Sequence, residues 1–222
     1  LMPFVSVEEN VGRFLSNFYL KEKQQRINEL LALVGMTEFS KIKAKFLSGG
    51  QMQRTALAKV LALEPKVLLL DEPFSHIDYH QKTELAQHVF QYCKEKGITV
   101  LYTSHTPEEI LMFSNEVIVM KNGTVIEKET PQNIYENPKE EYIARLTGEV
   151  NVIPPNYLTN ENELLLRPHQ LKVVDKGYEA EVLQVYYTGK KYLLKILFKD
   201  VILFVESDKK QSGKIKFEMI TS

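Results

Sequence analysis

Apolar residues recur at the spacing of α-helices in the first part of the chain. Ser6 and Glu9 have the spacing of a capping box, in which a hydroxyl and a glutamate satisfy free backbone N–H groups where a helix begins. The apolar positions of that helix are Val7, Val11, Phe14, Leu15 and Phe18. A second stripe comprises Ile27, Leu30, Leu31 and Val34, and Gly35 follows it where helices commonly end. Residues 1–46 therefore predict a small helical unit, whose apolar positions serve either internal packing or the docking of a partner.

A third predicted helix precedes a short apolar run. Ser48 and Gln51 repeat the capping-box spacing. The helix should run from Gln51 to about Leu63, because the residue before Pro65 disfavours helical backbone. Residues 66–70 then form a nearly continuous apolar run, which is typical of a strand covered on both faces, as in a parallel sheet.

The middle of the chain alternates strands with helices. A helix is predicted over 78–96 and a strand over 98–102; the inner side of the helix would carry Leu85, Ala86, Val89, Phe90 and Cys93. Strand, helix and strand in this order predict a parallel pair with a right-handed crossover. Asn122-Gly123 lies between two apolar runs and predicts a hairpin. Brief helices are expected to start near Pro107, Pro131 and Pro138.

The pattern changes at Gly148. Residues 151–162 read as a polar, proline-bearing linker. After it come only strand-like stretches, at 164–167, 170–174, 179–187, 191–199, 201–205 and 214–220. We therefore expect a small all-β, barrel-like domain over residues 148–222.

Composition narrows the class of protein. The 222 residues are 44% hydrophobic, which is enough for a buried core in one large or two small domains. The net charge of −1 gives no electrostatic reason to expect nucleic acid as a partner. Cys93 is the single cysteine, so no internal disulfide can form and a reducing compartment is the simplest expectation. No apolar run approaches the roughly 20 residues that a membrane-spanning helix needs.

Gly49 and Gly50, before the third helix, indicate a phosphate site. Backbone N–H groups at the start of a helix are unpaired and partly positive, and glycine lets an anion approach them closely. Ser48 can add a hydroxyl donor, and Gln51 can support the turn. Taken alone, the motif favours a plain glycine turn before a capped helix, and the residues that follow reverse that judgement.

Asp71 and Glu72 follow the apolar run, at the sheet edge where α/β proteins bind ligands. Asp71 can hold Mg²⁺, usually through water, and Glu72 can orient or deprotonate an attacking water for phosphoryl transfer. The alternative is an exposed acidic turn. His105 follows the next strand and should lie beside this pair, where its imidazole could bind a γ-phosphate or position the water. Asp78 is either part of this chemistry or simply the cap of the next helix.

In this order the motifs resemble those of the ATP-binding-cassette (ABC) ATPases. The matching segments are Leu47 to Gln51 for the signature motif, Leu68 to Glu72 for the Walker B strand and catalytic glutamate, Ser75 to Asp78 for the D-loop, and His105 for the switch histidine. The resemblance implies an α/β fold, the C-terminal part of a P-loop cassette. Its helical and signature subdomain would cover about 1–63, and a RecA-like part with a partial parallel sheet about 64–147. Residues 148–222 resemble the accessory TOBE-type β domain of importer ATPases, with Arg167-Pro168 as the best local match.

The resemblance also implies roles and partners. Two cassettes pair head to tail, so Ser48 to Gln51 would bind the ATP of a homodimer partner or paired cassette. Asp71 would hold Mg²⁺, and Glu72, His105 and the D-loop Asp78 would act on the ATP of their own subunit. The helical unit would contact transmembrane permease subunits. Such a protein is cytoplasmic, lies on the inner face of the cell membrane, and couples ATP hydrolysis to solute uptake.

A required phosphate-binding loop is missing from the sequence. No Gly-x-x-x-x-Gly-Lys-Ser/Thr motif (Walker A) occurs, and neither the Q-loop glutamine nor an adenine-stacking aromatic is found. We expect that the N-terminal part of the cassette is absent from this chain, which would then be inactive by itself. The unpaired sheet edge left behind should be covered or cause self-association.

Two other functions stay open at this stage. The chain as given could be a non-hydrolysing interaction or regulatory module. A chromosome-maintenance ABC ATPase would need long heptad segments, which the sequence lacks; in that variant the tyrosines and lysines of residues 186–195 would form an oligonucleotide-binding face.

Overall fold

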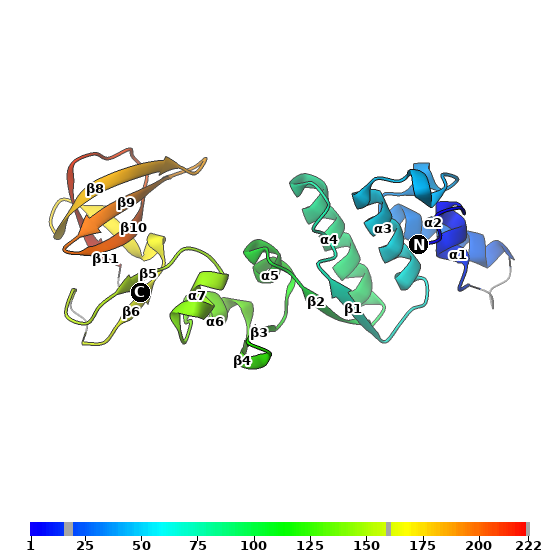
Figure 1. The fold of residues 1–222 in the computed structure, drawn as a ribbon, viewed down its shortest axis with the longest axis horizontal. Coiled ribbons are helices and arrows are strands. Elements are labelled where there is room, and N and C mark those ends of the chain that lie inside the picture. Colours follow the sequence, from blue (N-terminus) through cyan, green and yellow to red (C-terminus); the bar gives the residue numbers. More distant parts are fainter. Residues whose placement is uncertain (16–19, 159–160, 221–222) are drawn as a thin grey trace. The chain divides into compact units, whose positions relative to one another are not determined.

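The computed structural model describes residues 1–15, 20–158 and 161–220. The chain divides into two compact units, Leu1–Phe113 and Ser114–Ser222 (Figure 1). Each unit has its own hydrophobic core and is described by itself.

The first unit begins with a layer of helices. These are α1 (Val7–Gly12), α2 (Leu20–Leu33) and α3 (Gly49–Leu61), with 3₁₀ turns at Thr37–Phe39 and Ala44–Phe46 before α3. The capping boxes at Ser6 and Ser48 are both formed, and the apolar stripe of α2 is buried, as predicted. Because Ser48 is the cap itself, α3 begins two residues earlier than the sequence suggested.

Helix α1 is shorter than its apolar spacing predicted. It ends at Gly12, where the backbone turns and the amide of Leu15 donates to the carbonyl of Gly12 (3.1 Å). The turn carries Leu15 into the core and leaves Phe14 half exposed, so the prediction that Phe14 lies on the helix is wrong. Phe18 lies outside the described residues.

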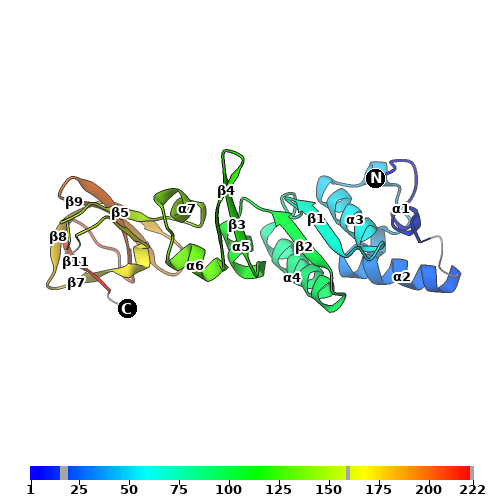
Figure 2. The ribbon, with the colours of Figure 1, turned by 90° about the horizontal axis from the view of Figure 1, so that it is seen from below.

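A parallel strand pair completes the first unit. β1 (Val67–Asp71) pairs with β2 (Thr99–Thr103), α4 (Tyr79–Glu95) joins them, and α5 (Pro107–Phe113) follows. The register sets Leu69 opposite Leu101 and Asp71 opposite Thr103, so the polar ends of both strands meet at one edge. Figure 2 shows β1 and β2 side by side with α4 along them.

The prediction that the β1 strand is covered on both faces is wrong for this chain. Leu68 is buried, whereas Leu69 is 70% exposed and its neighbour Leu101 is 56% exposed. Side chains alternate between the two faces of a strand. The core with α4 therefore covers one face, and the described part of the chain leaves the other face open.

The core of the first unit joins the helices to the sheet. Leu30, Leu61, Phe74 and Val89 are almost fully buried in it. Cys93 on α4 is buried as predicted, and this burial raises the pKa of its thiol to about 11.

The second unit begins with the predicted hairpin, β3 (Val117–Lys121) and β4 (Thr124–Glu129). Asn122 and Gly123 both have positive φ angles, 52° and 79°, as a type I′ turn requires. The short helices α6 (Pro131–Glu136) and α7 (Glu141–Leu146) follow.

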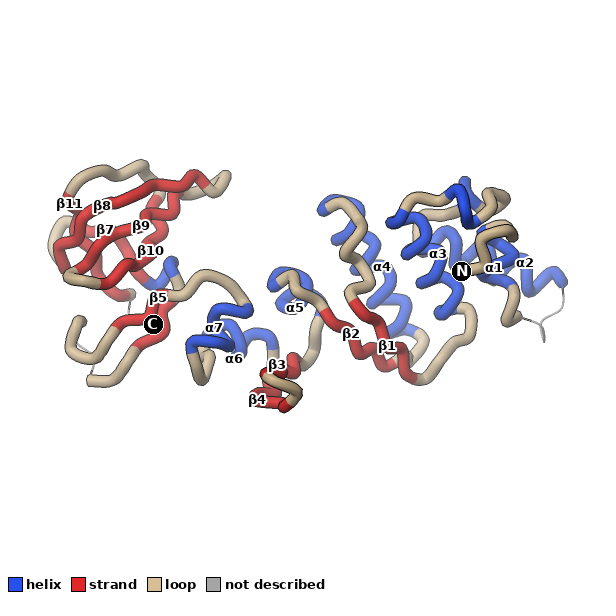
Figure 3. The backbone as a smooth tube through the Cα atoms, viewed as in Figure 1, coloured by secondary structure: helices blue, strands red, loops and turns tan. Residues whose placement is uncertain are grey.

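The rest of the second unit is the predicted small barrel. Strands close in the order β10-β7-β11-β8-β9, and Figure 3 shows these strands in red. Their bounds are β7 (Leu171–Val174), β8 (Tyr178–Tyr187), β9 (Tyr192–Phe198), β10 (Val201–Ser207) and β11 (Lys214–Met219). The barrel interior is apolar and includes Leu194, Ile196, Val205 and Phe217.

Part of the predicted linker is instead a strand. β5 (Asn151–Ile153) pairs antiparallel with β6 (Leu164–Leu166). The buried side chain of Asn151 donates to the carbonyl of Phe204 (2.7 Å) and accepts from its amide (2.6 Å). Because its amide group is paired with backbone groups, Asn151 can be buried in a strand. A prediction from the hydrophobic pattern therefore misses β5.

Within the described residues, no helix combines the length and the apolar character that crossing a membrane would require.

Candidate functional site

The predicted site residues lie in two groups, both in the first unit. Ser48 to Gln51 form the start of α3, and Asp71, Glu72 and His105 lie where β1 and β2 end. The loop of residues 72–78 connects the second group to α4.

The start of α3 is an ordered turn with one open glycine. The amide of Ser48 donates to Gln51 Oε1 (2.9 Å), and Ser48 Oγ accepts from the amide of Gln51 (3.3 Å). Nothing lies within 4 Å of a Cβ placed on Gly49, so this position can admit a ligand. A Cβ on Gly50 would lie 2.7 Å from the carbonyl oxygen of His76. The two predicted glycines thus differ, since Gly49 is open while Gly50 packs against the loop.

A recess of about 460 Å³ lies in front of this turn. It is lined by Ser48, Gly49, Gly50, Arg54, His76, Ile77, Asp78 and Gln81. The Nε atom of Arg54 is buried and has no hydrogen-bond partner among the described residues. A guanidinium beside free helix N–H groups makes the recess suitable for an anion. Arg54 was not predicted as a site residue, although its position one turn after the glycine pair places a cation near the start of the helix.

Asp71 and Glu72 are held at the sheet edge by Thr103. The hydroxyl of Thr103 donates to Asp71 Oδ1 (2.6 Å) and accepts from the amide of Glu72 (3.1 Å). Glu72 has a left-handed backbone with φ of 45°. Thr103 therefore fixes the positions of both acids, a role that the sequence did not reveal.

His105 lies beside Glu72, as predicted. Its Nδ1 is 3.1 Å from Glu72 Oε1, and both side chains are substantially exposed. An exposed pair of this kind contributes little to stability. The contact instead places the imidazole and the carboxylate where both can reach a ligand at the ends of β1 and β2.

Asp78 caps the next helix. Its Oδ1 accepts from the amide of Gln81 (3.2 Å) at the first turn of α4. The capping role that the sequence left open is therefore present, and a catalytic role for Asp78 stays a prediction.

A buried ion pair anchors the loop that carries His105. Lys82 on α4 contacts Glu109 on α5. The other oxygen of Glu109 accepts from the Ser104 hydroxyl (2.7 Å), and the amide of Thr106 donates to Ser104 Oγ (3.0 Å). Residues 104–106 are thus tied to two helices.

The residues at the sheet edge could supply only some of the ligands of a magnesium ion. Among the residues that the structure describes, no group of three or more histidine, cysteine or acidic side chains is arranged to hold a metal. Mg²⁺ needs few protein ligands, because water and phosphate oxygens complete its octahedron. The single carboxylate of Asp71 at the sheet edge fits that requirement.

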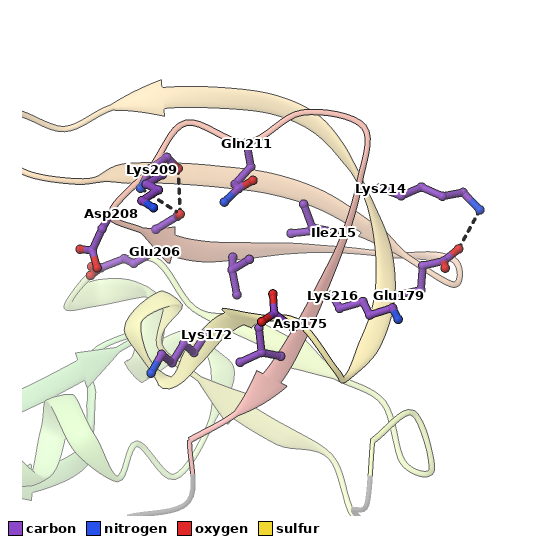
Figure 4. A pocket seen from close by; sticks show the side chains of 13 residues that line it. Lys172, Asp175, Glu179, Glu206, Asp208, Lys209, Gln211, Lys214, Ile215 and Lys216 are labelled. Atoms are coloured by element: carbon purple, nitrogen blue, oxygen red, sulfur yellow. Dashed lines mark hydrogen bonds and ion pairs between the residues drawn. The ribbon is translucent and has the colours of Figure 1, made fainter.

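The barrel carries a separate recess of about 550 Å³ (Figure 4). Lysines and acids share its lining, with Lys172, Lys209, Lys214 and Lys216 against Asp175, Glu179, Glu206 and Asp208. Lys214 pairs with Glu179 (2.7 Å) and Glu206 pairs with Lys191 (2.9 Å). The recess is therefore polar with balanced charge, and none of the predicted site residues lies in it.

The chain is similar in sequence to one known family and to several curated proteins. The family described as "ABC transporter" matches residues 1–75. The chain is 34% identical over 188 residues to the spermidine/putrescine import ATP-binding protein PotA of Borreliella afzelii (strain PKo), a match covering 82% of this chain and 52% of that protein. It is 38% identical over 176 residues to the PotA protein of Pseudomonas fluorescens (strain Pf0-1), covering 78% and 49%. The chain thus spans about half the length of these curated relatives.

Two solved structures have a similar fold. The dimeric ATP-binding cassette MJ0796, bound to ADP and Pi, aligns with a TM-score of 0.54 and 28% identity over 59% of each chain. The ADP form of MJ1267, an ATP-binding cassette of an ABC transporter, aligns with a TM-score of 0.51 and 21% identity over 65% of this chain and 63% of that one.

The fold is that of an ABC ATPase cassette segment followed by a small closed β-barrel. Residues 1–75 match the ABC transporter family, and the curated relatives that the chain resembles are named as import ATP-binding proteins.

Proposed function

We propose that the full-length protein is the ATP-hydrolysing subunit of an ABC importer and couples ATP hydrolysis to solute uptake. The observation that carries the proposal is the contact between Glu72 and His105 beside Asp71, in the same unit as the capped glycine turn of α3. The non-hydrolysing alternative receives no support from the comparisons.

Each residue has a role that its position supports. Glu72 would orient and deprotonate the attacking water, and His105 would hold that carboxylate and contact the γ-phosphate. Mg²⁺ would offset the negative charge of the phosphates, and Asp71 would hold it at the sheet edge. Ser48, Gly49 and Arg54 would bind the phosphates of ATP held by a paired cassette. Asp78 lies at the end of the loop of residues 72–78 and lines the recess, and we include it among the catalytic residues.

The helical layer of the first unit offers a surface for permease subunits. Phe4 and Phe46 are 72% and 69% exposed, and Lys45 lies over both rings at 5.7 and 4.7 Å. Exposed aromatic side chains of this kind are typical of protein contact surfaces. The subunit would dock there from the cytoplasmic side of the membrane. The names of the relatives make a polyamine the first solute to test.

The test is Glu72→Gln in the full-length protein reconstituted in vesicles with its permease subunits. We expect the wild type to hydrolyse ATP and to drive uptake of labelled spermidine or putrescine. The variant should lose at least about a hundredfold in hydrolysis, because it lacks the general base, while still forming ATP-dependent dimers. Unchanged hydrolysis in the variant would overturn the role of Glu72. Hydrolysis by the wild type without polyamine uptake would overturn the proposal that the solute is a polyamine.

A further inference from the structure

Helix α3 presses one face against the loop of residues 72–78. Gly50 and Gln53 are three residues apart and therefore share a side of the helix. At Gly50 the approach is so close that a Cβ would lie 2.7 Å from the carbonyl oxygen of His76. The first turn of α3 and the loop are thus in direct backbone contact.

The side chain of Gln53 bonds to this loop at two points. Its Nε2 donates to the carbonyl of Glu72 (2.8 Å), and its Oε1 accepts from the amide of His76 (3.3 Å). Both ends of one amide group are therefore used on the backbone of a single loop. This arrangement fixes the loop relative to the helix more firmly than one contact could.

Glu72 needs such support because its backbone is strained. A φ of 45° is a left-handed conformation, which costs a non-glycine residue on the order of 1 kcal/mol or more. The carbonyl of Glu72 also accepts from the amide (3.2 Å) and the hydroxyl (3.1 Å) of Ser75, within the loop itself. The Gln53 contact adds a bond from α3 to the same carbonyl.

We propose that Gln53 is a positioning residue that couples α3 to the catalytic glutamate. The inference rests on the proposed function, in which the start of α3 binds the ATP of a paired cassette while Glu72 acts on the ATP of its own subunit. Gln53 then links the two ATP sites through one cassette. A shift of α3 as it meets the partner's nucleotide is transmitted to the backbone of Glu72.

The kinetic test is Gln53→Glu in the full-length protein. The substitution keeps the shape and the acceptor for the amide of His76, but it sets an oxygen against the carbonyl of Glu72. We expect kcat for ATP to fall by about tenfold or more, because a small displacement of a catalytic group is costly, while KM stays near the wild-type value. Gln91→Glu is the matched control, since Gln91 is an exposed amide on α4 that donates to Glu95 (2.8 Å); its kcat should not change.

A second measurement needs no hydrolysis. In the 222-residue chain, Gln53→Leu removes the acceptor for the amide of His76, so hydrogen exchange of that amide should accelerate about tenfold while exchange in the middle of α3, at Leu57, is unchanged. An unchanged His76 amide, or an unchanged kcat in Gln53→Glu beside an active wild type, would overturn the coupling. A full-length wild type without ATPase activity would instead refute the proposed function, and the exchange result would still judge the Gln53 contact.

Discussion

At the scale of single residues, Arg167 is a buried cation outside the candidate site that makes many hydrogen bonds. It is 3% exposed, and it donates to the carbonyls of Tyr135, Ala144, Gly148 and Glu149 and to the hydroxyl of Thr147. Its guanidinium lies 4.3 Å from the centre of the Tyr135 ring. Desolvation lowers the pKa of Arg167. One buried cation thus ties the α6–α7 segment to the strand that leads into the barrel.

Arg167→Met should destabilise the second unit by about 3 kcal/mol, because several buried carbonyl groups lose their donors. Arg167→Lys should also be destabilising, since one ammonium cannot reach all of these acceptors. Urea unfolding of the chain, followed by a probe in the barrel, measures the change. The control is Arg145→Met, which removes an exposed pair with Glu141 and should cost at most about 0.5 kcal/mol. Equal losses in the two variants would contradict the role of Arg167.

Site residues could be predicted from the sequence where they belong to a motif and lie at the end of a predicted strand. Asp71 and Glu72 lie at the end of β1 and His105 follows β2, and parallel strands bring their ends together, so the proximity of Glu72 and His105 followed from the order of elements. Gln53 and Thr103 could not be found in this way. Their importance comes from the contact of α3 with the loop of residues 72–78 and from the contact of β2 with β1, which depend on tertiary packing rather than on spacing along the chain.

At the scale of elements, the Lys82–Glu109 pair joins α4, α5 and the loop between β2 and α5. Both side chains are largely buried, so each depends on the other for charge compensation. The pair therefore sets where His105 can lie.

Glu109→Gln should destabilise the first unit by about 3 kcal/mol, because it leaves the Lys82 ammonium buried without its counter-ion. A Lys82→Met, Glu109→Leu double variant should recover most of this loss, since it removes both charges together. Thermal or urea unfolding of the two variants gives the comparison. A double variant that is no more stable than Glu109→Gln would argue against a buried-charge explanation.

The starts of helices were predicted to within two residues where a side chain caps them. Ser6 and Ser48 fix the starts of α1 and α3, and the cap at Asp78 fixes the start of α4. The end of α1 and the existence of β5 were not predictable from periodicity. In both cases a local backbone contact, at Gly12 and at Asn151, decides the structure against the apolar pattern.

At the scale of the whole molecule, the open face of the β1–β2 pair is an exposed apolar surface next to the site. Val67 and Leu69 on β1 and Leu101 on β2 are each more than half exposed and lie on the same face. Each strand also pairs only with the other among the described residues, so both edges offer free backbone groups.

The chain by itself should therefore self-associate. We expect dimers or larger species whose fraction rises with concentration, and Leu69→Lys should shift the equilibrium toward monomer because a charge opposes burial of this face. Light scattering after size exclusion measures both. Leu183→Lys is the control, because Leu183 is 48% exposed on β8 of the barrel. A wild-type chain that stays monomeric at high concentration would refute the expectation.

The buried Cys93 gives the protein a practical property. Its thiol is nearly inaccessible, and a pKa of about 11 keeps it protonated at neutral pH, so it reacts slowly with maleimides and disulfide reagents. A cysteine introduced on the surface, for instance at Gln91, would carry a fluorophore or spin label selectively without removal of the native one. The natural chain is already a suitable background for site-directed labelling.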